Sequence, residues 1–163
     1  MPEAKFRIGL GLGANLGSPS ENLRRAVALL REAGLEIEAL SSLYRTPPWG
    51  DLDQPDFVNA CLLARTDLAP PELLDLTQRV EQAIGRRKTR HWGPRAIDID
   101  ILFHGEGAFS DARLVLPHPQ IARRAFVLLP LAEIAPGLRL GDLDVTEAAR
   151  TADRSGIALL GEF

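Results

Sequence analysis

Isoleucine and aspartate alternate from Ile97 to Ile101, and this alternation constrains the fold more than any other feature of the chain. Successive side chains in a β-strand point to opposite faces, and residues two apart lie about 6.6 Å apart along one face. A strand at this position would therefore turn its isoleucines towards a core. It would present Asp98 and Asp100 together on the opposite face.

Two aspartates on one strand face require a counter-charge, because aspartate is depleted in strands and like charges repel. A solvated strand face is the plainer interpretation. A bound cation is the more informative one, since Mg²⁺ takes oxygen ligands and often bridges carboxylates to substrate phosphates. We therefore expect Asp98 and Asp100 to bind Mg²⁺.

The segment immediately before this strand, residues 86–95, is rich in arginine and lysine and is interrupted by Gly93 and Pro94. A run of charge alone is usually a solvated loop. Beside two carboxylates it favours a phosphate substrate, because a divalent cation bridges some phosphate oxygens while Arg and Lys neutralise the others.

The chain has 163 residues, which predicts one domain over residues 1–163 with a substantial core. Its net charge of −3 argues against a surface that tracks nucleic acid. The first residues lack the apolar core of a signal peptide and no segment approaches a membrane span, so we expect a cytoplasmic protein without a membrane partner. Cys61, the only cysteine, lies in an apolar run and is expected to be a small buried side chain.

Apolar periodicity and turn residues predict a β-α-β-β-α-β order. The expected strands cover residues 6–12, 35–44, 57–66 and the Asp98/Asp100 segment, and the expected helices cover residues 20–33, with Ser20 as N-cap, and 70–84. This order is typical of an α+β, ferredoxin-like fold, in which helices pack on an antiparallel sheet. Carboxy-terminal additions follow, with helices expected near residues 126–134 and 146–151.

Motifs spread through residues 8–136 resemble the 6-hydroxymethyl-7,8-dihydropterin pyrophosphokinase family. The most specific is Trp-Gly-Pro-Arg-Ala-Ile-Asp-Ile-Asp, at residues 92–100, and the others occupy residues 11–17, 44–50, 53–59 and 116–118. The resemblance implies transfer of pyrophosphate from ATP to the hydroxymethyl group of the pterin, in folate biosynthesis, with two Mg²⁺ ions as cofactors.

The resemblance also implies roles for individual residues. Catalysis is expected from Arg86, Arg95, Asp98 and Asp100, of which the two aspartates hold the metal. ATP is expected to contact Gln78, Glu81, Arg86, Lys88, Trp92, Arg95, Ile101, Arg113, His118 and Arg124. The pterin is expected to contact Thr46, Pro47, Trp49, Phe57, Asn59, Asp98 and Phe126.

Some of these residues have plainer interpretations from pattern alone. Asn59 alternates out of an apolar strand, so its amide either binds the pterin edge or tethers a loop. Phe57 and Phe126 have the pattern of core aromatics. His118 has the pattern of a surface histidine, although the ordinary pKa of histidine would let it carry charge beside phosphate near neutral pH.

The chain departs from the commonest family pattern at several positions. Phe57 stands where a tyrosine is common, and Trp49 where an aliphatic residue is common. The basic segment is one residue shorter, so Arg87 and Lys88 compete for one phosphate contact. These departures bear on loop closure and nucleotide affinity, and none removes a metal ligand.

Other functions fit the sequence less well. A ferredoxin-like sheet with a basic loop and Trp92 resembles some RNA-binding modules, but their exposed strand aromatics are not in the sequence and the aspartate pair would repel phosphate. Gly11 and Gly13 are out of register with a dinucleotide-binding loop. A different Mg²⁺-dependent transferase on the same scaffold is the remaining alternative. We expect a monomer that binds ATP and the pterin, and no nucleic acid.

Overall fold

The computed structural model describes residues 4–48, 52–85, 94–105 and 107–163. Its strands are β1 (Phe6–Ala14), β2 (Glu36–Leu40), β3 (Leu43–Thr46), β4 (Phe57–Thr66), β5 (Asp98–His104), β6 (Phe109–Ser110), β7 (Val115–Leu116), β8 (Arg139–Leu140), β9 (Leu143–Asp144) and β10 (Ala158–Gly161). Its helices are α1 (Pro19–Glu32), α2 (Pro70–Ile84), α3 (Ala125–Ile134) and α4 (Val145–Thr151), with a 3₁₀ turn at Ile121–Arg123.

The main sheet has the strand order β10-β3-β4-β1-β5, and β2 pairs with β4 beside β3. All these pairs are antiparallel, and β1 lies between β4 and β5. The element order up to β5 is β-α-β-β-α-β if β2 and β3 are taken as one interrupted strand. The predicted α+β, ferredoxin-like fold is therefore confirmed.

The predicted strand at residues 35–44 is interrupted at Ser41 and Ser42. Ser41 exchanges two hydrogen bonds with Cys61 of β4: its backbone N–H donates to the Cys61 carbonyl, and its hydroxyl accepts from the Cys61 N–H, each at 2.9 Å. A side chain thus replaces one backbone partner, which explains why the regular ladder stops here.

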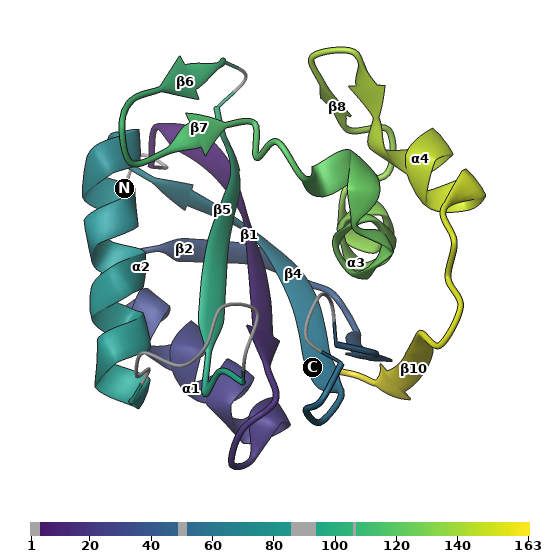
Figure 1. Cartoon of the computed structure of the whole chain (residues 1–163). Helices are drawn as coiled ribbons and strands as arrows, with labels where there is room; N and C mark the ends of the chain where they lie inside the picture. Colours follow the sequence, from purple (N-terminus) through teal and green to yellow (C-terminus); the bar gives the residue numbers. More distant parts are fainter. Residues whose placement is uncertain (1–3, 49–51, 86–93, 106) are drawn as a thin grey trace.

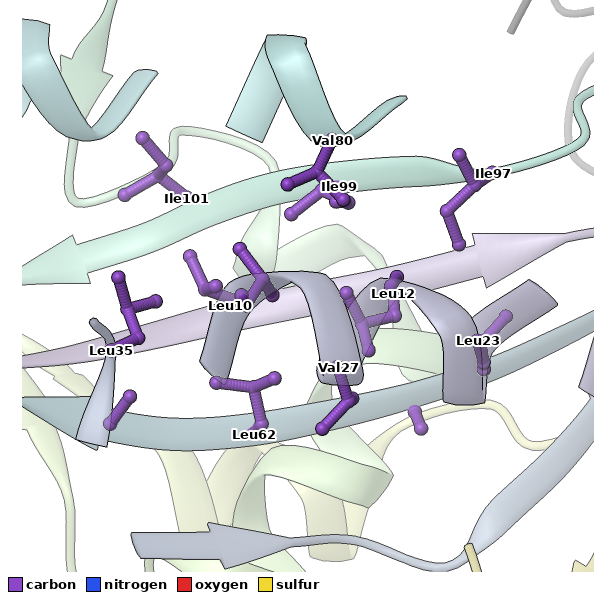
Figure 2. Close-up of a cluster of buried hydrophobic side chains, with 14 of the residues drawn as sticks. Leu10, Leu12, Leu23, Val27, Leu35, Leu62, Val80, Ile97, Ile99 and Ile101 are labelled. Carbon is purple, nitrogen blue, oxygen red and sulfur yellow. The ribbon is translucent and has the colours of Figure 1, made fainter. Parts of the chain in front are cut away.

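Helices α1 and α2 cover one face of the sheet, and α3 lies on the other (Figure 1). Leu10 and Leu12 of β1 point towards α1 and α2, together with the isoleucines of β5 (Figure 2). Ile97, Ile99 and Ile101 are each at most 5% exposed. The alternation read from the sequence is therefore confirmed, and it leaves the aspartates on the α3 side of the sheet.

The ends of the helices follow from local chemistry. Helix α2 has the predicted bounds, because Pro70 suits the first helical position and Gly85 takes a left-handed φ of 106° at its end. The prediction that Ser20 is the N-cap of the first helix is wrong. The N-cap is Ser18, two residues earlier, and the helix begins at Pro19, because proline is favoured at the first helical position.

The carboxy-terminal additions complete the sheet. The expected helices near residues 126–134 and 146–151 are α3 and α4, and Asp144 caps α4 by accepting a hydrogen bond from the Glu147 N–H. Strand β10 then pairs with β3, the strand that ends at Thr46. Among the described residues, no helix is both long and apolar enough to span a membrane.

Candidate active site

The site is built on the α3 side of three adjacent strands. Pairing across β4, β1 and β5 sets Asn59, Gly13 and Asp98 in one row. The next row on the same face consists of Cys61, Gly11 and Asp100. Glycine therefore occupies the central position of both rows, and the lack of side chains from β1 there leaves a hollow between β4 and β5, which the Asn59 side chain partly fills above Gly13.

A cavity of about 220 Å³ lies over this hollow. It is lined by Gly11, Leu12, Gly13, Thr46, Pro47, Phe57, Asn59, Ala60, Cys61, Arg95, Asp98, Asp100, Arg124, Phe126 and Val127. The cavity thus brings together the predicted metal-binding aspartates, two of the predicted phosphate-binding arginines and most of the predicted pterin-binding residues. The predicted residues in this lining come from four separate parts of the chain, which are residues 46–47, 57–59, 95–100 and 124–126.

Arg124 provides a positive charge next to the aspartates. Its Nη1 lies 3.7 Å from Oδ2 of Asp100, and its side chain is 14% exposed. The guanidinium also lies over the ring of Phe126, 5.7 Å from the centroid. Arg124 is the residue just before α3, so the start of this helix carries a cation to the edge of the cavity.

Asn15 organises the entrance to β5, a role that its sequence pattern did not predict. Its Oδ1 accepts a hydrogen bond from the Arg95 N–H at 2.8 Å, and its Nδ2 donates to Oε1 of Gln54 and to the carbonyl of Pro55, each at 2.9 Å. Asn15 is 4% exposed. One buried amide therefore joins the segment that carries Arg95 to the segment that leads into β4. The sequence does contain a signal for this role. Asn15 is a polar residue directly after an apolar strand, and it lies within the motif at residues 11–17.

The Asn59 side chain is held by a neighbouring strand. Its Nδ2 donates to Oγ1 of Thr46 at 2.6 Å, and both residues are buried. This bond confirms that Asn59 tethers the end of β3, while its position in the cavity wall is compatible with ligand binding as well. Phe57 and Phe126 line the same cavity and are only partly buried, so they are not simple core aromatics.

The expected ATP-contacting residues on α2 lie outside the cavity lining. Gln78 accepts a hydrogen bond from Nη2 of Arg113 at 3.3 Å, and the same nitrogen forms a 2.8 Å ion pair with Asp75. Glu81 is buried and accepts a hydrogen bond from the backbone N–H of Ile99 at 2.8 Å. The side chain of Ile101 lies in the core beneath α1 and α2, so only its backbone is placed to meet a ligand.

His118 is neutral in the folded protein. Burial, with a smaller effect from the charge of Arg124, lowers its pKa to about 4. Its Nδ1 accepts a hydrogen bond from the Gln120 N–H at 3.1 Å, so the remaining proton is on Nε2. His118 is therefore uncharged near neutral pH while no nucleotide is bound, and its expected contact with the ATP phosphates stays a prediction.

Cys61 is 1% exposed, and burial raises the pKa of its thiol, which confirms the expected small buried side chain. Trp49, Arg86, Arg87, Lys88 and Trp92 lie outside the described residues. Their expected contacts with the pterin, ATP and phosphate stay predictions.

Known proteins that are similar to this chain belong to the family that its sequence motifs resemble. The family model for 7,8-dihydro-6-hydroxymethylpterin-pyrophosphokinase matches residues 9–136. The 2-amino-4-hydroxy-6-hydroxymethyldihydropteridine pyrophosphokinase of Methylorubrum extorquens is 49% identical over 152 residues, which are 93% of this chain and 96% of that protein. The protein of the same name from Pseudomonas aeruginosa is 44% identical over 137 residues, which are 83% of this chain and 85% of that protein.

A solved structure shows the same fold. The HPPK-DHPS triple mutant of Plasmodium falciparum with pteroate has a TM-score of 0.74 at 13% sequence identity. The match covers 96% of this chain and 47% of that one, so this chain spans about half of the larger protein. The family model and the bacterial relatives together show that this chain belongs to the 7,8-dihydro-6-hydroxymethylpterin-pyrophosphokinase family.

Proposed function

We propose that this chain transfers pyrophosphate from ATP to the hydroxymethyl group of 6-hydroxymethyl-7,8-dihydropterin, giving AMP and the pterin diphosphate in folate biosynthesis, and that it does so in the cavity over Gly11 and Gly13. Besides family membership, one observation carries this proposal. A single cavity has an aromatic end with a buried amide and an ionic end with two carboxylates and two arginines. A flat heterocycle and a polyphosphate need those two environments side by side.

The aromatic end suits the pterin ring. Phe57 and Phe126 offer ring surfaces, and aromatic side chains favour stacked or edge-to-face contact with other flat rings. Asn59 and Thr46 supply polar atoms at the same end, where a carboxamide can pair with neighbouring donors and acceptors on a ring edge. Pro47 completes the wall. We infer that this end orients the hydroxymethyl group towards Asp98.

The ionic end suits Mg²⁺. Asp98 and Asp100 supply carboxylate oxygens, and no group of three or more acidic, histidine or cysteine side chains that could hold a metal occurs among the described residues. Two carboxylates leave most positions of an octahedral ion to water and substrate phosphates, which is the usual arrangement for Mg²⁺ in phosphoryl-transfer sites. Bound there, the two expected ions would offset the phosphate charge and make the attacking hydroxyl easier to deprotonate.

The arginines would neutralise the phosphate charge that the metal ions do not offset. In-line attack of the pterin hydroxyl on the β-phosphorus of ATP leaves AMP as the departing group, and catalysis of such a transfer depends on positioning and charge stabilisation. Arg95 and Arg124 line the cavity and would neutralise the migrating pyrophosphate. His118, with its proton on Nε2, would donate a hydrogen bond to a phosphate oxygen. Arg86 stays a predicted third contact.

The assay is incubation of the protein with ATP, Mg²⁺ and the hydroxymethyl pterin, with nucleotides and pterins separated chromatographically. We expect AMP and pterin diphosphate in equal amounts, and no AMP when the pterin is omitted. Release of free pyrophosphate with an adenylated pterin would instead identify a nucleotidyltransferase. A matched control is Glu21→Gln, which removes an acid from the exposed side of α1 and should leave the products unchanged. Monomeric state, cytoplasmic location and the lack of nucleic-acid or membrane partners stay predictions.

A further inference from the structure

Glycine recurs at alternate positions of β1, and the expected chemistry assigns these residues no role. Glycine weakens a strand, so a glycine inside one often marks a close approach of another group. The φ angle of Gly13 is not in the left-handed region, so any residue could adopt its backbone conformation. The reason for glycine at this position must therefore be space.

The space above Gly13 is taken by the Asn59 side chain. A Cβ built on Gly13 would lie 2.5 Å from Oδ1 of Asn59, far inside van der Waals contact. The next nearest atoms to the same Cβ would be Cγ of Asn59 at 3.6 Å and Cδ1 of Phe57 at 3.9 Å, which are ordinary distances. At Gly11, by contrast, the nearest atom to such a Cβ is a Leu102 methyl at 3.5 Å. At Gly9 a Cβ would lie 2.4 Å from Cε1 of Phe103, but neither of these residues lines the cavity. Of the two glycines in the cavity lining, only Gly13 therefore has such a tight contact.

The carboxamide of Asn59 is consequently fixed from both ends. Its Nδ2 donates to Oγ1 of Thr46 at 2.6 Å, and its Oδ1 lies over the bare Cα of Gly13. A rotation of the amide would break the bond to Thr46. Because Asn59 and Gly13 both line the cavity, this arrangement settles which atom of the amide is offered to a ligand.

We propose that Gly13 is a positioning residue that holds the oxygen of Asn59 as the hydrogen-bond acceptor for an N–H group on the edge of the pterin ring. This proposal rests on the proposed function. A methyl group at position 13 displaces Oδ1, which is the end of a flexible side chain, so the fold is retained while the acceptor leaves its place. Gly13 then acts on ring recognition through Asn59 and has no part in phosphate binding.

The test is a double-mutant cycle with Gly13→Ala, Asn59→Ala and the double variant, measured by titration with the pterin and separately with a non-hydrolysable ATP analogue and Mg²⁺. Loss of one aligned hydrogen bond predicts about tenfold weaker pterin binding for Gly13→Ala. The affinity for the ATP analogue should stay within about twofold. In the Asn59→Ala background, the added methyl should change pterin affinity by less than about twofold, since the displaced group is gone.

The outcomes separate the two proposals. If the parent protein does not bind the pterin, the proposed function fails and this inference fails with it. If the parent binds but Gly13→Ala binds equally well, or weakens pterin binding as much without Asn59 as with it, only the role of Gly13 is refuted. Should Gly13→Ala fail to fold, folding of the double variant would still support the specific contact with Asn59. A double variant that also fails to fold would show that the methyl group collides with something else.

Discussion

The carboxylate of Glu81 accepts a hydrogen bond from the backbone N–H of Ile99, the residue between Asp98 and Asp100, at 2.8 Å. Strand β5 is the last in the order of the main sheet, and α2 packs beside it (Figure 1). A buried side chain of α2 thus satisfies a donor of the strand that carries both predicted metal ligands. The relationship makes Glu81 a support for the geometry of the aspartate pair, in addition to any contact with the nucleotide.

Replacement of Glu81 should therefore affect stability as well as turnover. Glu81→Ala leaves the Ile99 N–H without this acceptor, and an unsatisfied buried donor costs about 1–3 kcal/mol. Glu81→Gln retains an oxygen acceptor and should cost clearly less. Urea unfolding of both variants measures the difference. Equal losses of unfolding free energy in the two variants would mean that the charge of Glu81, and not this hydrogen bond, is what matters.

The aspartates themselves should be dispensable for folding. Asp98→Ala and Asp100→Ala remove partly exposed carboxylates on the cavity side and leave the isoleucine core intact. We expect turnover to fall by at least about 10²-fold, because a metal ion supplies several kcal/mol of transition-state stabilisation. Steady-state kinetics with Mg²⁺, alongside circular dichroism, make the comparison. Activity within a few-fold of the parent in both variants would contradict the metal assignment.

The elements that the sequence predicted well are those specified by local patterns. The alternation around Asp98 and Asp100 indicated both the strand and its buried face, and strand β4 and helix α2 have the expected bounds. Each depends on side-chain periodicity or on terminal residues such as Pro70 and Gly85. These signals are complete within about fifteen residues, so no tertiary information is needed to read them.

The features that the sequence did not predict depend on contacts between distant segments. Asn15 bonds to residues 39 to 80 positions away, and no local pattern specifies that arrangement. The interruption at Ser41 follows from a side-chain bond to Cys61, on another strand. The charge state of His118 depends on burial and on Arg124. In each case the amino acid was visible, but its environment exists only once the chain has folded.

The lowered pKa of His118 predicts a pH dependence of stability. The ordinary pKa is 6.5 and the folded-state pKa is about 4, so between these values the unfolded chain binds more protons than the folded one. Stability from this group is therefore fully present above about pH 6.5 and is lost as the pH falls towards 4. His118→Asn keeps an acceptor for the Gln120 N–H but does not titrate there. Its unfolding free energy should fall less steeply than that of the parent between pH 6.5 and 4. Parallel curves for the two proteins would contradict the conclusion that folding lowers the pKa of His118.

Asn15 provides a test of whether the Arg95 segment and the Gln54–Pro55 segment are coupled through one amide. Asn15→Asp keeps an oxygen to accept from the Arg95 N–H but loses the donor to the Pro55 carbonyl and to Gln54. We expect it to cost about 1–3 kcal/mol of unfolding free energy, since a new negative charge at a buried position then faces two acceptor oxygens with no proton to share between them. Protonation of the new carboxyl restores one donor, so the deficit relative to the parent should shrink as the pH falls. Asn15→Ala removes both the donor and the acceptor of the amide. Its loss of unfolding free energy relative to the parent should therefore not shrink as the pH falls. Denaturation of the three proteins at several pH values measures this difference, and a pH-independent deficit in Asn15→Asp would show that its donor bonds do not hold the two segments together.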